Sequence, residues 1–215
     1  MVATPVLDAA EVAFFAYLQR LISRRNMFLP KDVSRICAVD AAYRKRRVVA
    51  VASVFEHGRL LEANSYAGSC SLPYVSGLFY LREGPFVVQA VKGLKVSPTL
   101  VCFDAHGAAH PRYTGLATVC GMVLGIPSIG CAKSLLVGSV VTGKRGPDRI
   151  VHDGKTLGFV TGSNGMTRHW SPGYSVSLGE LETLLRRCAP VCLKAMSQSD
   201  RAAREQVLLH REDSE

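Results

Sequence analysis

The order of the apolar segments between residues 36 and 132 restricts the folds that this chain can adopt. Three short stretches, the second of them rich in Val, are bounded by charged or glycine-containing turns and predict antiparallel strands over residues 36–42, 48–55 and 60–67. The apolar period then changes, which predicts alternating helices and strands over residues 82–95 (helix), 100–104 (strand), 115–124 (helix) and 127–132 (strand). Helices between strands allow parallel pairing, so we expect one mixed α/β sheet flanked by helices.

This succession is that of the ribonuclease H-like architecture, in which the first and fourth strands are neighbours in the sheet. We expect the remaining segments to complete a single domain over residues 1–215. They are an N-terminal amphipathic helix over about 7–25, strands within 140–170, a helix over about 178–188 that Ser177 caps, and a charged helix or frayed tail over about 194–215.

Three acidic residues interrupt apolar contexts that such a sheet brings together. Asp40 and Asp104 each end a strand-like apolar run, and Glu83 stands near the start of a helical pattern. A buried carboxylate costs free energy unless a cation or hydrogen bonds compensate it. Taken singly, an Asp after a strand is more often a turn former or a helix cap. The three together predict a magnesium site that acts on phosphate esters.

The charge and cysteine content restrict partners and compartment. A formal net charge of +9 suits a polyanionic partner such as nucleic acid, or an anionic membrane surface. No stretch approaches about 18 apolar residues and no signal peptide is evident, so we expect neither a membrane span nor secretion. The seven cysteines include no Cys-x-x-Cys pair, which argues against a zinc ribbon and predicts buried reduced thiols in a cytoplasmic protein.

A stiff loop with an aromatic residue lies between the third strand and the first long helix. Pro73 restricts its backbone, Gly77 permits a tight turn, and Tyr74 stands between them. A rigid aromatic at a basic site can wedge between bases, although a Tyr that caps the core is an equal alternative. His110 and Lys133 follow predicted strands, where a cation contacts a phosphate; for Lys133 an ordinary solvated lysine is the alternative.

Residues 138–145 match the spacing GxxxxGK of a phosphate-binding loop but not its chemistry. That loop needs Ser or Thr after the Lys to hold magnesium, and Arg145 stands there. The chain also lacks GxSxG and HExxH motifs. A P-loop nucleotidase, a serine hydrolase and a zinc protease are therefore not expected.

Taken together, these residues resemble the endonuclease V family, nucleases that repair deaminated bases. The resemblance runs from about Ile36 to Ser177, most of the chain. Its ordered pieces are residues 39–40, 73–77, 82–85, 104–112, 126–134 and 171–173. The family has a ribonuclease H-like fold, in agreement with the predicted order of strands.

The resemblance implies hydrolysis of a phosphodiester bond in DNA that contains a deaminated base, inosine above all, by a monomer that uses Mg²⁺ or, as a substitute, Mn²⁺. The cut is implied at the second bond on the 3′ side of the lesion, and inosine in RNA is a further candidate substrate. By position, Asp40, Asp104 and Glu83 are implied as metal-binding and catalytic, and Lys133 as catalytic at the phosphate.

The resemblance also implies how a flipped base is held. Tyr74, supported by Pro73, is the implied wedge that fills the gap in the duplex. The implied hypoxanthine pocket consists of backbone groups near Gly77, Leu78, Phe79, Ala105 and Gly107, with His110 in the neighbouring network. A deaminated pair is weak, so opening it costs little.

This chain departs from the family pattern at two positions. Ala105 stands where the family has Gly, and its methyl group can crowd the base-recognising loop. Tyr174 stands where the family motif Ser-Pro-Gly-His has an active-site His, which predicts a slower or altered nuclease because Tyr is neutral with a pKa of about 10. The C-terminal segment also offers no clear counterpart for charged residues found further along in many relatives.

Three hypotheses follow. The chain is an inosine-directed nuclease, an inosine-binding homologue weakened by Tyr174, or a nuclease of the same fold that acts on branched structures. The three intact carboxylates favour the first, because a lapsed site has no physical reason to keep mutually repelling charges. The loop from Pro73 to Gly77 argues against the third.

Overall fold

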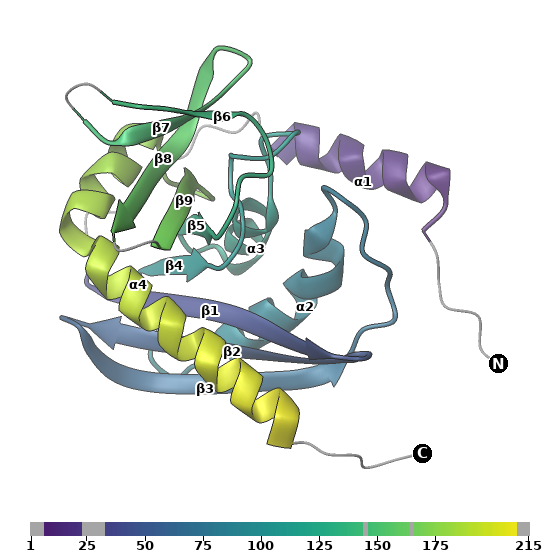
Figure 1. Cartoon of the computed structure of the whole chain (residues 1–215). Coiled ribbons are helices and arrows are strands. Elements are labelled where there is room, and N and C mark those ends of the chain that lie inside the picture. Colours follow the sequence, from purple (N-terminus) through teal and green to yellow (C-terminus); the bar gives the residue numbers. More distant parts are fainter. Residues whose placement is uncertain (1–6, 23–32, 144–145, 164–165, 210–215) are drawn as a thin grey trace.

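The computed structural model describes residues 7–22, 33–143, 146–163 and 166–209, and within them nine strands join one mixed sheet (Figure 1). The strands are β1 (Arg35–Arg44), β2 (Arg47–Glu56), β3 (Arg59–Ser69), β4 (Leu100–Phe103), β5 (Ser128–Ala132), β6 (Ser139–Val141), β7 (Asp148–His152), β8 (Lys155–Ser163) and β9 (Met166–Pro172). Their spatial order is β3-β2-β1-β4-β5-β9-β8-β7-β6. β1, β2 and β3 pair antiparallel while β1, β4 and β5 pair parallel, which confirms the predicted mixed sheet.

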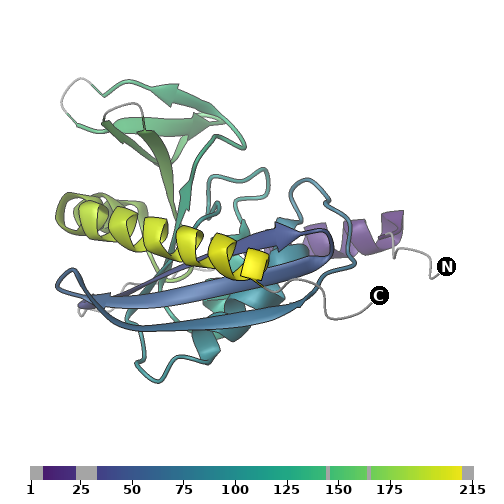
Figure 2. The same ribbon diagram turned by 60° about the horizontal axis from the view of Figure 1, so that its bottom comes forward.

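Helices cover both faces of this sheet. They are α1 (Ala9–Ile22), α2 (Phe79–Lys92), α3 (Leu116–Leu124) and α4 (Leu178–Leu209). α2 and α3 pack on one face and α4 crosses the other, as Figures 1 and 2 show. Along β1 the side chains alternate between the two cores: Cys37 and Val39 pack toward α2, and Ile36 and Ala38 toward α4. Because both faces of this central strand are covered by apolar cores, the side chains from Ile36 to Val39 are all buried and form one continuous apolar run.

The pairing of β1 with β4 brings the two predicted aspartates together. Val39 is the partner of Phe103, and the Asp104 amide donates to the Val39 carbonyl oxygen at 3.3 Å. β1 continues beyond Asp40 as far as Arg44, paired only with β2. Asp40 therefore lies within β1, at the point where its parallel neighbour ends.

One helix is shifted from its predicted position and another is longer than predicted. α2 begins at Phe79, three residues early, so Pro85 lies inside it. α4 runs unbroken to Leu209 across Pro190, and the predicted tail beyond residue 194 is its second half. Proline in a helix interior costs about 3 kcal/mol. Burial offsets that cost, because α4 presents a stripe of buried residues to the sheet: Cys192, Ala195, Met196, Ser199, Ala203 and Val207.

The N-terminal helix starts where its acidic residues predict. Asp8 Oδ1 accepts from the Glu11 amide at 2.8 Å, and Glu11 Oε2 accepts from the Asp8 amide at 2.9 Å, a reciprocal capping box. α1 ends at Ile22, and the basic end predicted at Arg24 and Arg25 lies outside the described residues. The one residue that α1 buries is polar, Gln19.

The remaining sequence expectations concern the glycine-lysine segment, the cysteines and the membrane. A phosphate-binding loop would lead from a strand into a helix, whereas β6 leads to the antiparallel β7. This agrees with the prediction that residues 138–145 do not form such a loop; Lys144 and Arg145 lie outside the described residues. All seven cysteines are free thiols. Among the helices in the described ranges, none combines the length and apolar character needed to cross a bilayer.

Candidate active site

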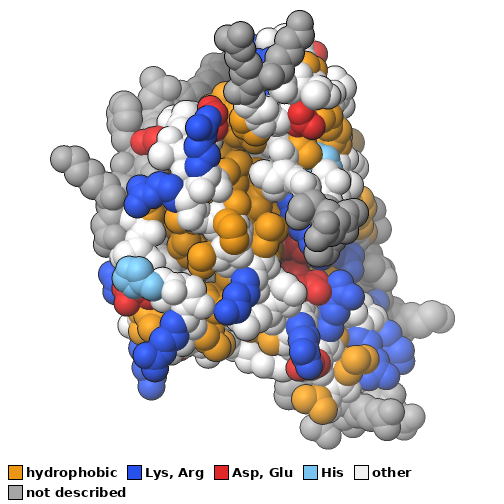
Figure 3. Space-filling view, turned by 60° about the vertical axis from the view of Figure 1, so that its left-hand side comes forward, with side chains coloured by type: hydrophobic (Ala, Val, Ile, Leu, Met, Phe, Trp, Pro, Cys, Tyr) orange, Lys and Arg blue, Asp and Glu red, His pale blue; other side chains and the backbone are white. Residues whose placement is uncertain are grey.

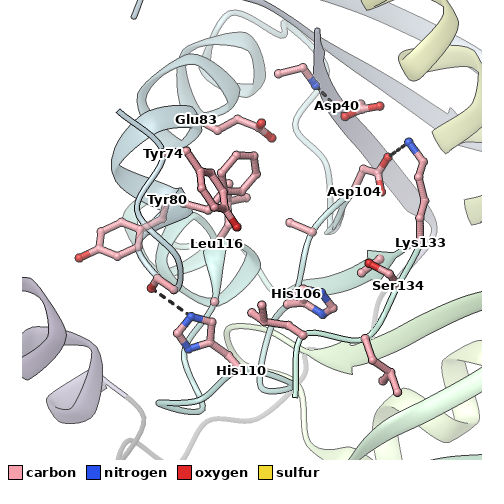
Figure 4. Close-up of a pocket in the computed structure, with 18 of the residues that line it drawn as sticks. Asp40, Tyr74, Tyr80, Glu83, Asp104, His106, His110, Leu116, Lys133 and Ser134 are labelled. Atoms are coloured by element: carbon pink, nitrogen blue, oxygen red, sulfur yellow. Dashed lines mark hydrogen bonds and ion pairs between the residues drawn. The ribbon is translucent and has the colours of Figure 1, made fainter. Parts of the chain in front are cut away.

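Three carboxylates meet beside the end of β4, and Figure 4 shows two of them, Asp40 and Asp104. Asp40 comes from β1, Asp104 follows β4, and Asp200 comes from the second half of α4. One oxygen from each of these side chains lies within 4.8 Å of the others. Hard oxygen ligands at this density are what Mg²⁺ and Mn²⁺ prefer in proteins, so these residues fit a divalent ion.

Asp40 is the most strongly perturbed acid of this group. Its side chain is buried and its Oδ1 accepts from the Ala41 amide at 2.8 Å. Burial, the charge of Asp104 and a hydrogen bond to Asp200 raise the pKa of Asp40 to about 9. Burial opposes ionisation of Asp200, but that hydrogen bond and nearby cations lower its pKa overall. Asp40 thus holds a proton that a divalent cation would displace.

Glu83 occupies the same cavity but is held apart from the three aspartates. It is buried in the second turn of α2, and its Oε2 accepts from the Tyr43 hydroxyl at 3.1 Å. Burial raises the pKa of Glu83 to about 8, against the lowering effect of that hydrogen bond. The Arg82 guanidinium lies 4.9 Å from the centre of the Tyr43 ring and anchors this pair.

Lys133 supplies the cation of the site. Its Nζ lies 2.5 Å from Asp104 Oδ2 and 3.3 Å from Asp200 Oδ1, although half of the side chain is exposed. Burial lowers the pKa of Lys133, but the hydrogen bond to Asp104 and the surrounding carboxylates raise it overall. A charged ammonium is therefore held where negative charge gathers, at the end of β5.

A cavity of about 450 Å³ extends from the carboxylates toward the loop that carries Tyr74. Tyr74 stands at its rim with 61% of its surface exposed, and its ring centre is 5.9 Å from that of Phe79. Apolar side chains, among them Ala105 and Leu116, line the interior. An exposed aromatic beside an apolar cavity is the arrangement that a wedge and a base pocket require.

Other residues implied for the base pocket have different surroundings. Leu78 belongs to the buried core, and neither Leu78 nor Pro73 lines the cavity. Gly107 is also absent from the lining; a Cβ there would collide with the carbonyl oxygen of Pro172, so glycine is needed for close packing on β9.

His110 does not face the carboxylates. It is buried, its Nδ1 accepts from the Arg112 amide at 3.1 Å, and its Nε2 lies 3.1 Å from the Gly77 carbonyl oxygen. Burial and the charge of Arg112 lower the pKa of His110 to about 4, so the imidazole is neutral and donates to Gly77. Its place is in the wall that supports the turn at Gly77 (Figure 4).

The structure also corrects the expectation about Tyr174. Its amide donates to Ser128 Oγ at 2.8 Å, at the first residue of β5, whereas Lys133 follows the last. Five residues of strand separate these ends by roughly 16 Å. Tyr174 does not line the cavity, so it does not stand where an active-site histidine would act.

Asp200 is the functional candidate that sequence reasoning missed. The C-terminal segment, from which the sequence yielded no site residue, supplies Asp200 to the carboxylate cluster. Asp200 stands in the stretch Ser-Gln-Ser-Asp-Arg, where a charged residue looks like part of a solvated helix face. Four residues on, Arg204 pairs with it at 3.0 Å, an ordinary surface pattern that gives no local signal of a metal site.

Comparisons with known proteins agree with this geometry. The Endonuclease V family model matches residues 16–196. An endonuclease V of Saccharolobus islandicus is 35% identical over 185 residues, covering 84% of this chain and 90% of the relative. One of Geotalea uraniireducens is 39% identical over 159 residues, covering 71% of this chain and 68% of the relative.

Solved structures give the same result. The crystal structure of endonuclease V from Streptomyces avermitilis has a TM-score of 0.81 and 25% identity, covering 99% of this chain and 98% of that one. The Ciona intestinalis endonuclease V, in complex with DNA containing an inosine followed by a ribo-adenosine, has a TM-score of 0.77 and 19% identity, covering 92% of this chain and 98% of that one. Given the family match over residues 16–196, the carboxylate cluster and these relatives, this chain belongs to the endonuclease V family of nucleases.

Proposed function

We propose that this chain is a divalent-metal-dependent endonuclease that nicks DNA near a deaminated base, inosine above all. The observation that carries the proposal is the convergence of Asp40, Asp104 and Asp200 within 4.8 Å, beside a cavity with an exposed aromatic at its rim. Three acids from distant segments repel one another, and a bound cation gives that arrangement a physical reason.

Asp40, Asp104 and Asp200 would hold the ion, with Mg²⁺ the expected metal and Mn²⁺ its substitute. When bound, such an ion polarises a phosphate oxygen and favours formation of hydroxide from water. Glu83 lies on the same cavity, and its raised pKa suits a group that accepts a proton near neutral pH. Glu83 would therefore orient and deprotonate the attacking water.

Lys133 would neutralise charge on the phosphate and on the leaving oxygen. Its Nζ now bonds Asp104 and Asp200, and half of its side chain remains open to solvent, so it can turn toward a bound phosphate. A lysine acts there as a point charge, which suits the developing charge of phosphodiester hydrolysis. Lys133 would thus complete the catalytic group.

The cavity supports recognition of a base outside the duplex. Its volume of about 450 Å³ is sufficient for a purine, and Ala105 and Leu116 offer apolar surface to a base face. Tyr74 would fill the gap that the flipped base leaves. The Ciona relative, whose structure contains an inosine in DNA, supports this choice of base.

The overall charge suits a nucleic-acid partner. Lysine and arginine side chains lie scattered over the face shown in Figure 3, with an apolar strip between them. Phosphate contacts from such residues make binding fall with salt, by about 0.9 logarithmic units per contact on duplex DNA. A cut at the second bond 3′ to the lesion, action on inosine in RNA, a role in DNA repair, a monomer and a cytoplasmic location stay predictions.

The two other hypotheses have less support. The inosine-binding homologue was suggested by Tyr174, which lies at the far end of β5 from Lys133 and gives no reason for weakened chemistry. The nuclease for branched structures has no use for Tyr74 at the rim of a base-sized cavity.

One experiment separates the three hypotheses. Matched duplexes with and without a single inosine are incubated with the protein in Mg²⁺, Mn²⁺ or chelator, and the nick is mapped on a sequencing gel. The proposal predicts a nick that needs both inosine and metal, at the second bond on the 3′ side. Tight inosine binding without a nick in either metal would favour the binding homologue, and cutting of branched DNA alone would favour the third hypothesis.

A further inference from the structure

The one fully buried side chain of α1 is an amide, while apolar side chains such as Phe15 and Leu18 are only partly buried. Gln19 has no exposed surface, whereas Phe14 and Tyr17 on the same helix are more than half exposed. Burying an amide costs free energy unless its donors and acceptor find partners, so a helix held in this way has specific contacts to make.

Those contacts join α1 to Gly77, which lines the cavity, and to the segment before the lining residue Gly115. Gln19 Nε2 donates to the Thr114 carbonyl oxygen at 2.7 Å and to the Gly77 carbonyl oxygen at 3.1 Å. Gln19 Oε1 accepts from Arg112 Nε at 2.5 Å. One side chain therefore links the turn that follows Tyr74 to the segment that leads into α3, and its own carbon atoms line the cavity.

The Gly77 carbonyl oxygen is the point at which these bonds converge. Besides Gln19, it accepts from Arg112 Nη2 at 2.5 Å and from His110 Nε2 at 3.1 Å. Gly77 has a φ of +75°, and a Cβ there would lie 2.6 Å from Arg112 Nη2, so only glycine fits. The turn itself closes with a 2.9 Å bond from the Leu78 amide to the Val75 carbonyl oxygen.

We propose that Gln19 is a positioning residue for base recognition: it holds the Gly77 turn, and with it the wall of the cavity and the base of the Tyr74 loop, in place for an extruded base. The inference rests on the proposed function, because it assigns the cavity to a base. α1 is then part of the recognition site, although the sequence marks it only as an amphipathic helix.

If Gln19 served only to dock α1 on the domain, an apolar side chain would be expected at this position. A helix that only needs to dock is held as well or better by an apolar side chain, which carries no desolvation cost. Of the three partners of Gln19, Gly77 lines the cavity, Thr114 directly precedes the lining residue Gly115, and Arg112 also bonds the Gly77 carbonyl oxygen. Fixed hydrogen bonds define a position more narrowly than apolar contact does, which is what discrimination between similar bases requires.

Two substitutions separate the bonds of Gln19. Gln19→Glu keeps the shape of the side chain and the acceptor for Arg112, but it loses the donor to the carbonyl oxygens of Gly77 and Thr114. Gln19→Met loses all three bonds. The matched control is Gln89→Glu, at an exposed position of α2. Each variant is tested in Mg²⁺ for single-turnover nicking of inosine and inosine-free duplexes, for its melting temperature, and without DNA for amide hydrogen exchange of residues 72–79.

We expect both Gln19 variants to lose about tenfold to a hundredfold in the ratio of inosine to inosine-free nicking, as lost hydrogen bonds at a specificity site do. Exchange in residues 72–79 should be at least about tenfold faster, and the melting temperatures should fall only moderately below that of Gln89→Glu, because the buried partners of Gln19 lose their bonds. Unchanged exchange and an unchanged ratio in Gln19→Glu would overturn the inference. So would equal losses on both duplexes accompanied by a large fall in melting temperature, which describe a merely structural residue.

The outcome is separable from that of the proposed function. If the unaltered protein does not nick inosine DNA, the proposed function fails, while the exchange measurement still tests whether Gln19 fixes the turn. If the unaltered protein nicks selectively and the Gln19 variants remain as selective, only the present inference fails. Should Gln19→Met not fold, Gln19→Glu carries the test because it keeps the side-chain shape.

Discussion

The ammonium group of Lys133 lies 2.5 Å from Oδ2 of Asp104, and 3.3 Å from Oδ1 of Asp200 on a helix that lies far along the chain. A single cation at the end of β5 thus links an acid beside β4 to one on α4. Both acids belong, with Asp40 of β1, to the proposed metal site, and Asp200 is the member that only the folded chain reveals.

Asp200→Asn should abolish metal-dependent nicking while DNA binding persists. Loss of one of three carboxylates weakens the site for a divalent ion, whose Lewis acidity is worth several kcal/mol. We expect the single-turnover rate in Mg²⁺ to fall at least about a hundredfold, with partial recovery in excess Mn²⁺. Asp153→Asn, at an exposed turn, is the matched control. A rate within threefold of the unaltered protein would remove Asp200 from the site.

Asp40→Asn should stabilise the metal-free protein in a pH-dependent way. The pKa of Asp40 is raised from 3.8 to about 9 by folding, so its contribution to stability is complete below about pH 4 and is lost as the pH rises toward 9. Asparagine cannot ionise and avoids that loss. Between pH 5 and pH 8, an interval of three pH units, the advantage of the variant should grow by up to about 4 kcal/mol.

Thermal unfolding in chelator at the two pH values tests this expectation. Added Mg²⁺ should stabilise the unaltered protein at pH 8 and reverse the order of the two melting temperatures, because an ion that binds only the folded state shifts the equilibrium toward it. A difference in melting temperature that is the same at both pH values would contradict the raised pKa.

Tyr74→Ala should impair nicking of inosine DNA without affecting stability. The side chain is 61% exposed and its aromatic neighbour is Phe79, so little burial is lost. Stacking of a base on an aromatic ring is worth about 1–3 kcal/mol, which corresponds to a loss of roughly fivefold to 150-fold in kcat/KM. Tyr74→Phe should stay close to the unaltered protein. Equal effects of the two substitutions would point to the hydroxyl and not to a wedge.

Tyr174→His should leave the nicking rate within about twofold of its original value. The backbone of Tyr174 is bonded to Ser128 at the start of β5, remote from Lys133 at the other end of the strand. A histidine there cannot reach the carboxylates. A large gain in rate in Mg²⁺ would show that this position acts on the site after all.

Local sequence patterns and side-chain chemistry by themselves predicted the central strands of the sheet and most of the acidic residues at the site. Alternating apolar runs predicted β1 to β5 in the correct order, and parallel pairing of β1 with β4 followed from the intervening helix. Asp40, Glu83 and Asp104 were detectable because each interrupts an apolar stretch, where a charge needs a reason. These are properties of neighbouring residues, and a sequence displays them directly.

Only the tertiary structure decided which distant residues join Asp40, Glu83 and Asp104 at the site. Asp200 and Gln19 lie on helices where a polar residue is ordinary. Their roles arise from contacts with distant segments: Gln19 bonds residues 58 and 95 positions away, and Asp200 bonds Lys133, 67 positions away. Tyr174 was expected at the active site from its place in a motif, but its backbone lies at the start of β5, because a motif gives spacing and not the direction in which a strand returns. Such contacts depend on how α1, α4 and β9 dock, and docking is set by burial summed over whole faces, which no local pattern records.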